Sequence, residues 1–365
     1  MIPYGKHNII QEDINSVISV LKSNFLSTGP IVNEFEEKFV EYVGAKYAVA
    51  VANGTAALHV ACLASGLNKG DELLTSPMSF VASANCAFYC GAKPGFVDIK
   101  LNGLIDVNKI KINKNIKIII PVHYAGLTVD VKQIRDKFKD VIIIEDAAHA
   151  LGSKHDDVMV GSCKYSEMTI FSFHPVKHIT SGEGGMITTN SKELYEKLLL
   201  FRTHGIVKNS GNNKWSQDMQ VLGYNYRLSD IHSALGLSQL NRVNDFISQR
   251  RKLAKKYDEA FAENPHIEII KEESNQFHSY HLYVIKLKNK EARLKLFDHL
   301  RKNDIFCQVH YLPIYLNTFY RELGYEKGLC VNAEEFYDRI ISIPMYYGLE
   351  DKEQDKVIDC INNFF

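Results

Sequence analysis

Lys177 has the residue type and the setting of a nucleophile. It lies in the segment MTIFSFHPVKHITSGEGGMITT, residues 168–189, where an apolar stretch is followed by a short polar turn and a glycine pair. The stretch 168–173 predicts a buried strand, so the turn would hold the lysine just beyond the end of that strand. Partial desolvation lowers the pKa of an amine and frees the neutral form that attacks carbonyls. A solvated lysine in a strand connection would have the same local sequence, and the rest of the chain must decide between the two interpretations.

Asp146 lies at the end of another apolar stretch, in the segment VIIIEDAAHA, residues 141–150. An aspartate in this position often caps a helix or forms a turn, which involves no chemistry. A buried carboxylate, however, needs a cationic partner. A protonated pyridine nitrogen is one such partner, and pyridoxal phosphate (PLP) sites place an aspartate opposite the pyridinium. Asp146 is therefore a candidate catalytic acid, with the helix cap as the alternative.

An anion-binding turn is predicted near residue 54. The apolar run 47–52 is followed by the turn Asn53-Gly54-Thr55 and by a helical stretch that starts at Ala56. A strand, a glycine turn and a helix start direct backbone N–H groups and the positive end of the helix dipole at an anion. A turn of this kind occurs in many strand–helix units, so it is weak evidence alone. Together with a lysine and a strand-end acid, it completes the set of groups that PLP chemistry requires.

The composition is that of an ordinary globular protein. The chain has 365 residues, of which 45% are hydrophobic and 24% charged, and this length is sufficient for two domains. The 43 basic and 43 acidic residues cancel, so no overall field would attract nucleic acid or an anionic membrane. We therefore expect neither as a partner. Any anionic ligand must be held by local groups.

The cysteines and the N-terminal segment indicate a reducing compartment. The seven cysteines are odd in number and scattered, without a C-x-x-C pair, which argues against a disulfide framework and against a metal site. The segment MIPYGKHNII lacks the basic and apolar regions of a signal peptide. No apolar run approaches the roughly 18 residues that a membrane span needs. We expect a cytoplasmic protein.

Apolar and amphipathic segments alternate along the first part of the chain, which is typical of an α/β fold. Strands are expected at 47–52, 72–75, 95–99, 116–122, 141–146 and 168–173, and helices at 11–21, 31–42, 56–66, 79–90, 106–110, 131–139 and 191–203. This alternation predicts a mostly parallel sheet with helices on both faces. Ligands of such sheets bind at the carboxyl ends of the strands.

The pattern changes beyond residue 240 and predicts a second domain. We expect a large cofactor-binding domain with an N-terminal arm over 1–240, and a smaller α+β domain over 241–365, connected by one long helix at about 230–263. The small domain should contain strands at 267–270, 281–287 and 305–310, with helices near 291–303, 333–341 and 351–363. The polar stretch 208–216 is a candidate mobile loop.

Four motifs carry a resemblance to a known family. They are NGTAAL (53–58), EDAAHA (145–150), FSFHPVKHITSGEGG (171–185) and GYNYRLSD (223–230). In this order they resemble the DegT/DnrJ/EryC1/StrS family of nucleotide-sugar aminotransferases, which are PLP enzymes of fold type I, like aspartate aminotransferase. The resemblance implies a large, mostly parallel sheet domain and a smaller C-terminal α+β domain.

The segments FSFHPVK, RTHGIVK (202–208) and CQVHYLPIY (307–315) are most similar to the branch of the family that aminates C-4 in pseudaminic acid biosynthesis. This similarity implies that the substrate is a UDP-linked 4-keto-6-deoxy-N-acetyl-hexosamine of the β-L-arabino configuration, with L-glutamate as the amino donor. It also implies a homodimer with shared active sites.

The resemblance assigns cofactor roles to individual residues. Lys177 would form the Schiff base with the cofactor and move the proton between the cofactor C4′ and C-4 of the sugar. Asp146 would keep the pyridine nitrogen protonated, His149 would lie near the ring hydroxyl, and Phe80 would stack on the ring. The phosphate would be bound by Gly54, Thr55, Ala56 and Ser172, and by Asn225 of the neighbouring subunit.

The resemblance also implies a substrate site. It consists of Tyr4, Asn24, Phe25, Leu26, Ser27, Gly54, Ser172, Asn225, His310, Tyr311, Leu312 and Pro313. Without the family, His310 and Tyr311 would be interpreted simply as the end of a strand.

Four departures from the pseudaminic branch leave the exact sugar open. They are PVHYAG (121–126), the short NGTAAL turn, SIPMYYGL (342–349) and His178, which replaces a proline. Another UDP-linked 4-keto sugar, of the bacillosamine type or from another surface glycan, is therefore an alternative. The family members that dehydrate sugars at C-3 have histidine in place of the lysine, and the presence of Lys177 disfavours that activity. A non-catalytic PLP-binding regulator could dispense with Lys177 or Asp146, and both are present.

Overall fold

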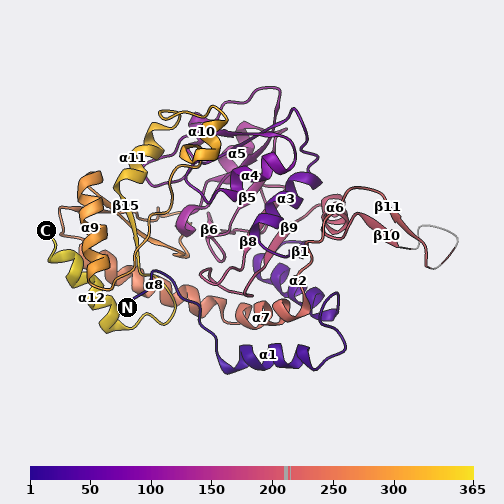
Figure 1. Ribbon diagram of the computed structural model, residues 1–365, viewed down its shortest axis with the longest axis horizontal. Helices are drawn as coiled ribbons and strands as arrows, with labels where there is room; N and C mark the ends of the chain where they lie inside the picture. The colour runs from indigo at the N-terminus through magenta and orange to yellow at the C-terminus, as the bar shows by residue number, and fades with distance from the viewer. Residues whose placement is uncertain (209–212, 214) are drawn as a thin grey trace.

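The computed structural model describes residues 1–208, 213 and 215–365 (Figure 1). Its central element is a seven-stranded sheet in which the strands on one side of the antiparallel strand β9 all run parallel. In spatial order the strands are β1 (Tyr47–Val51), β9 (Gly185–Thr189), β8 (Met168–Ser172), β5 (Ile142–Asp146), β4 (Ile116–Ile120), β2 (Glu72–Thr75) and β3 (Lys93–Phe96). The predicted mostly parallel sheet is therefore present.

Helices cover both faces of this sheet. They are α2 (Pro30–Val43), α3 (Gly54–Ala64), α4 (Ala82–Tyr89), α5 (Val131–Lys137) and α6 (Lys192–Arg202). Ile118 and Ile120 of β4 belong to the same apolar cluster as the buried residues of α3 and α4. Ile119 belongs to a second cluster, with Ile134 of α5. Because successive side chains of a strand point to opposite faces, the strand is buried on both sides, which explains its continuous apolar sequence.

A second, antiparallel sheet lies in the C-terminal part of the chain. Its strands are β12 (Ile267–Ile269), β14 (Tyr283–Leu287) and β15 (Ile340–Ile343). The helices of this part are α9 (Lys290–Lys302), α10 (Thr318–Glu322), α11 (Val331–Arg339) and α12 (Asp351–Asn362). The N-terminus lies beside it, since Ile2 pairs with Ile305, and Figure 1 shows the N-terminal label close to α8 and α12. The predicted domain boundary at residue 240 stays a prediction.

The remaining elements are short or peripheral. Helix α1 (Gln11–Leu21) packs against α7 (Asp230–Leu240), and α8 (Val243–Phe261) follows. Strands β10 (Ile206–Lys208) and β11 (Gln217–Met219) form an arm that projects from the molecule in Figure 1. Strands β6 (Lys154–His155), β7 (Val158–Met159) and β13 (Gln276–Phe277) form a small sheet. Short 3₁₀ helices are η1 (Val107–Lys109), η2 (Tyr124–Gly126) and η3 (Ile314–Leu316). Of the predicted mobile loop 208–216, residues 209–212 and 214 lie outside the described part.

The single long helix predicted at about 230–263 is wrong. The structure has α7 and α8 instead, separated at residues 241–242, where Asn241 is a poor helix former. Helix α7 packs against α1 and α2, whereas the second half of α8 buries Leu253, Tyr257 and Phe261 in the C-terminal core. The break allows the two helices to follow these different surfaces.

Three other element predictions are corrected. Residues 305–310 form no continuous strand, because Ile305 pairs with Ile2 and Gln308 pairs with Ser342 at isolated positions. The helix predicted to 341 ends at Arg339, and the apolar residues that follow form β15. The segment 106–110 is only a 3₁₀ turn, η1. Within the described residues, no helix is both long and apolar enough to cross a bilayer.

Candidate active site

A cavity of about 480 Å³ opens at the carboxyl ends of β4, β5 and β8, where the sheet architecture predicts a ligand. It brings together residues that are far apart in the sequence. The predicted site residues that line it are Tyr4, Gly54, Thr55, Phe80, Asp146, His149, Ser172, Lys177, His310 and Tyr311.

Lys177 directs its amine into this cavity. The turn that carries it begins at the end of β8, and the Lys177 backbone N–H donates to the carbonyl of His174 over 2.9 Å. Burial lowers the pKa of the amine to about 8, although the nearby Asp146 carboxylate opposes this shift. A substantial share of the amine is therefore neutral near pH 8. The alternative of an ordinary solvated lysine does not fit this environment.

Asp146 is held rigidly at the end of β5. It is 5% exposed, and its carboxylate accepts hydrogen bonds from Ser83 Oγ at 2.6 Å and from the Ala148 backbone N–H at 3.1 Å. Among the ion pairs between described residues, none involves Asp146. A buried carboxylate with a fixed orientation and no cation bound to it suits a protonated ring nitrogen in the cavity.

The predicted anion-binding turn forms the first residues of α3. Asn53 caps the helix, and its side chain accepts a hydrogen bond from the Ala56 N–H at 2.8 Å. The Ala56 amide donates to this cap, and the roles of Gly54, Thr55 and Ala56 in phosphate binding stay predictions. A Cβ at Gly54 would lie 2.9 Å from the Cβ of Ser172, so only glycine allows the turn to approach β8 this closely.

His149 makes hydrogen bonds through both ring nitrogens. Its Nδ1 accepts from the Ala125 backbone N–H at 3.3 Å, so the remaining hydrogen of the neutral ring is on Nε2, which lies 3.1 Å from Tyr311 Oη. Burial, together with the positive charge of Lys177, holds the pKa of His149 well below its usual range. The imidazole therefore stays neutral and donates to Tyr311, and the tyrosine hydroxyl hydrogen is free to point elsewhere.

Aromatic side chains form the walls of the cavity. Phe80 is 59% exposed, which excludes an ordinary core position, and its ring lies 6.4 Å from that of Tyr311. The N-terminal arm places Tyr4 in the cavity, 5.4 Å from the ring of His310, and the Tyr4 carbonyl is bonded by the N–H of Met345. Burial and the charge of Lys177 lower the pKa of His310 to about 4, so this imidazole is also neutral.

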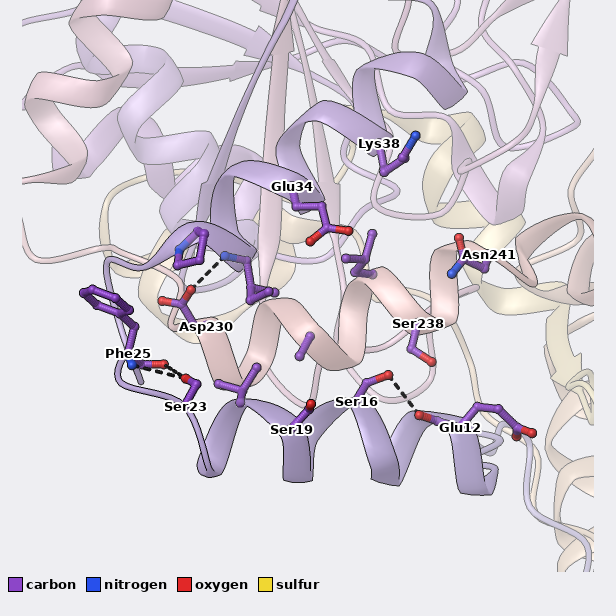
Figure 2. Close-up of a pocket in the computed structure, with 15 residues that line it drawn as sticks. Glu12, Ser16, Ser19, Ser23, Phe25, Glu34, Lys38, Asp230, Ser238 and Asn241 are labelled. Atoms are coloured by element: carbon purple, nitrogen blue, oxygen red, sulfur yellow. Dashed lines mark hydrogen bonds between the residues drawn. The ribbon is translucent and has the colours of Figure 1, made fainter.

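Several predicted substrate residues lie outside the cavity in the single chain. Residues 24–27 are held against α7, where Asp230 N–H donates to the Leu26 carbonyl and Ser27 pairs with Ser229. Phe25 lines a different cavity, of about 670 Å³, between α1, α2 and α7 (Figure 2). Other predicted residues outside the active-site cavity are Ala56, Leu312, Pro313 and the exposed Asn225.

The cavity also contains polar residues that the prediction missed. They are Ser83, His174 and Glu183. Ser79 and Ser83 are bonded to each other over 2.6 Å, and Ser83 in turn supports Asp146. Ser79 also lines the cavity and precedes α4, which begins at Ala82.

Comparisons with known proteins extend over the whole chain. The model of the DegT/DnrJ/EryC1/StrS aminotransferase family matches residues 7–362. A Campylobacter jejuni protein named UDP-4-amino-4,6-dideoxy-N-acetyl-beta-L-altrosamine transaminase is 40% identical, over 99% of this chain and 96% of the relative.

Solved structures show the same likeness. Helicobacter pylori PseC, an aminotransferase involved in the biosynthesis of pseudoaminic acid, superposes with a TM-score of 0.94 at 33% identity, covering 100% of this chain and 99% of PseC. The PLP form of Spr1654 from Streptococcus pneumoniae superposes with a TM-score of 0.93 at 28% identity, covering 100% of this chain and 98% of that structure.

Proposed function

Because the chain belongs to the DegT/DnrJ/EryC1/StrS aminotransferase family, we propose that it aminates a UDP-linked 4-keto sugar in pseudaminic acid biosynthesis. The substrate is UDP-2-acetamido-2,6-dideoxy-β-L-arabino-hexos-4-ulose, the donor is L-glutamate and the product is the 4-amino sugar. One observation carries the chemistry: the low-pKa amine of Lys177 and the fixed carboxylate of Asp146 face one cavity. The full-length similarity to the named transaminase supports the choice of sugar.

The cavity fits PLP, the cofactor of this family, and the fold type I architecture expected from the motifs is confirmed by the structural neighbours. Lys177 would hold the cofactor aldehyde and Asp146 the ring nitrogen, with Phe80 as a wall beside the ring. Gly54 and Ser172, which approach each other closely, would hold the phosphate. When bound, PLP supplies an electron-accepting ring.

The protein's own groups supply the remaining steps. Lys177 removes and returns the proton at C-4 of the sugar, and its neutral form is available near its pKa of about 8. Asp146, whose carboxylate is oriented by Ser83 and the Ala148 N–H, would keep a proton on the ring nitrogen of the bound cofactor. His149 stays neutral and orients the Tyr311 hydroxyl.

The proposal includes a homodimer in which Asn225 of each chain completes the site of the other. Asn225 is exposed and lies outside the cavity of its own chain. Among the described residues that line the cavity, Lys177 is the only lysine and none is arginine. A diphosphate and a dicarboxylic donor require more positive or amide groups than one chain supplies. A cytoplasmic location stays a prediction.

A panel of UDP-4-keto-6-deoxy-N-acetyl-hexosamines, assayed with L-glutamate, tests the choice of sugar. We expect amination of the β-L-arabino sugar, with the configuration at the new amino group determined by NMR. The two epimers differ at a single centre, which only the shape of the pocket can discriminate. Amination of the D-xylo epimer alone would instead assign the protein to a bacillosamine-type pathway. A protein that binds PLP but aminates no sugar would be a non-catalytic regulator.

A further inference from the structure

A buried loop that follows β4 contacts residues of the active-site cavity. This segment, residues 123–129, which we call the β4 loop, is buried throughout. Its His123 N–H donates to the Asp146 carbonyl at 3.1 Å, and its Ala125 N–H donates to His149 Nδ1 at 3.3 Å. None of its own residues is among the described residues that line the cavity. The β4 loop therefore acts on the cavity through the residues that it holds.

The β4 loop adopts a conformation that needs support. Ala125 has a φ of 59°, in the left-handed region that disfavours a residue with a Cβ atom, and Gly126 follows with a φ of 102°. Ser153 supports the middle of the loop, where its hydroxyl donates to the Gly126 carbonyl at 2.7 Å. The side chain of His123 joins the two ends, because its Nδ1 accepts a hydrogen bond from the Val129 N–H at 3.0 Å. His123 thus closes the loop around the strained residue.

The contacts of His123 determine which of its nitrogens carries the hydrogen. Since the Val129 N–H donates to Nδ1, the hydrogen of the ring is on Nε2, which lies 2.8 Å from the Glu145 carboxylate and donates to it. The hydroxyls of Ser166 and Thr169 donate to the same carboxylate. Glu145 is buried and is therefore an acceptor with a fixed orientation. The imidazole is held on both sides, by a backbone amide and by a carboxylate.

Two imidazoles are therefore oriented by backbone amides of one loop. The Ala125 amide does for His149 what the Val129 amide does for His123, and His149 Nε2 is left to donate to the Tyr311 hydroxyl at 3.1 Å. Displacement of the Ala125 amide would remove the contact that selects this tautomer of His149. The hydroxyl of Tyr311, which lines the cavity, would then lose its fixed donor.

We propose that His123 is a positioning residue for the aminotransferase reaction: it closes the β4 loop, so that the Ala125 amide holds His149 in the tautomer that donates to Tyr311. This role rests on the proposed aminotransferase function, which it deepens. Glu145 is the acceptor that fixes the ring of His123 in turn. His123 itself acts through His149 and lies outside the residues that line the cavity.

Two substitutions separate the two contacts of His123. Glutamine can place its amide nitrogen near the position of Nε2 and keep the donor to Glu145, but it offers no acceptor to the Val129 N–H. Asparagine can place its oxygen near the position of Nδ1 and keep the acceptor for Val129, but it does not reach Glu145. His123→Gln should therefore open the loop, whereas His123→Asn should keep it closed. His155→Gln is the matched control, because His155 bonds only the Thr128 hydroxyl of the loop, which also donates to the Lys154 carbonyl.

Nuclear magnetic resonance of the PLP-loaded protein, labelled with ¹⁵N-histidine, measures the tautomers directly. In the wild type, long-range ¹H–¹⁵N correlations should show both His123 and His149 with the hydrogen on Nε2. His149 should become a mixture of tautomers in His123→Gln and stay a single tautomer in His123→Asn and His155→Gln. A wild-type His123 with hydrogen on Nδ1 would overturn the proposal without any variant. A single, unchanged tautomer of His149 in His123→Gln would overturn it as well.

Steady-state assays with L-glutamate and the UDP-linked β-L-arabino 4-keto sugar connect the tautomer to the reaction. His123→Gln should lower kcat about 10- to 100-fold, the range expected when a group near the reacting atoms is misplaced. His123→Asn should recover most of the wild-type kcat, and His155→Gln should leave it unchanged. A His123→Gln variant with wild-type kcat would refute the positioning role. A wild-type protein that aminates no sugar would refute the proposed function instead, while the magnetic resonance result would still decide whether His123 fixes His149.

Discussion

At the residue scale, the two imidazoles nearest to Lys177 in the cavity, those of His149 and His310, stay uncharged. The pKa values of His149 and His310 are both lowered by burial and by the lysine itself, so neither imidazole adds positive charge to the cavity near neutral pH. The carboxylate of Asp146 is the opposing influence on the amine. Burial is therefore the dominant reason that the lysine gives up its proton at a pH where a surface lysine would keep it.

This environment predicts a pH-dependent effect of Lys177→Met on the stability of the PLP-free protein. The folded-state pKa of about 8 lies below the ordinary 10.5, so the unfolded chain binds more protons between these values and wild-type stability rises with pH in that window. The methionine variant should be more stable at pH 7 by about 1–2 kcal/mol, because it removes a buried cation. Urea unfolding should show this difference shrinking from pH 8 to pH 10. A difference that does not change with pH would contradict the assigned pKa.

Asp146→Asn should reduce turnover about 10²–10³-fold, the usual effect of removing one preorganised electrostatic group. Asparagine keeps the shape of the side chain and one carbonyl oxygen but removes the negative charge, which we propose holds the proton on the ring nitrogen. Steady-state assays with L-glutamate measure the loss. Asp140→Asn, an exposed acid that precedes the same strand, is the control and should leave kcat unchanged. Equal effects of the two substitutions would refute the role of Asp146.

At the scale of elements, the sequence predicts a site residue only where its position at the end of a strand is sufficient to place it in the cavity. Gly54 and Lys177 follow apolar strands and Asp146 is the last residue of one, and the sheet brings these strand ends together. Glu183 reaches the cavity through the long connection from β8 to β9, which no local pattern predicts. The break between α7 and α8 is likewise set by the surfaces on which they pack. In segment 305–310, Ile305 pairs with Ile2 near the N-terminus and Gln308 pairs with Ser342, and neither partner follows from the local sequence.

Gly54→Ala tests the close approach of the α3 turn to β8. The new methyl group would meet the Ser172 side chain at 2.9 Å, which forces the turn away from the strand end. Overpacking of this kind costs about 1–3 kcal/mol, so the Kd for PLP should rise about tenfold or more. Gly5→Ala is the matched control, since its Cβ would lie at an ordinary 3.5 Å from Val176. Fluorescence titration with PLP that gives the same Kd for both variants would contradict the phosphate-binding turn.

At the scale of the whole molecule, the balanced charge of the chain means that an anionic substrate is recognised locally. The described cavity residues supply one lysine, and Asn225 lies on the surface of the same chain. Both features are explained if two chains share each active site, as the motif GYNYRLSD predicts through family resemblance. A closed pair of sites related by two-fold symmetry would then contain both copies of Asn225.

Complementation between two inactive variants tests this shared site. In a dimer of one Lys177→Ala chain and one Asn225→Ala chain, one site contains both substitutions and the other is wild type. Co-expression with random pairing should therefore recover about a quarter of the wild-type activity per chain. Each variant expressed alone should have little activity. If the residues act within one chain, no mixed dimer contains an intact site, and absence of recovery in purified mixed dimers would contradict the sharing.

The central claim is tested most directly by the coupled formation of two products. The PLP-loaded protein, supplied with L-glutamate and the UDP-linked β-L-arabino 4-keto sugar, should release 2-oxoglutarate and UDP-linked 4-amino sugar in equal amounts. Lys177→Ala should release neither. Mass spectrometry of the nucleotide sugar and enzymatic measurement of 2-oxoglutarate follow both products in one reaction. PLP-loaded protein that forms neither product with this sugar or with its D-xylo epimer would contradict the assignment as a UDP-4-keto-sugar aminotransferase.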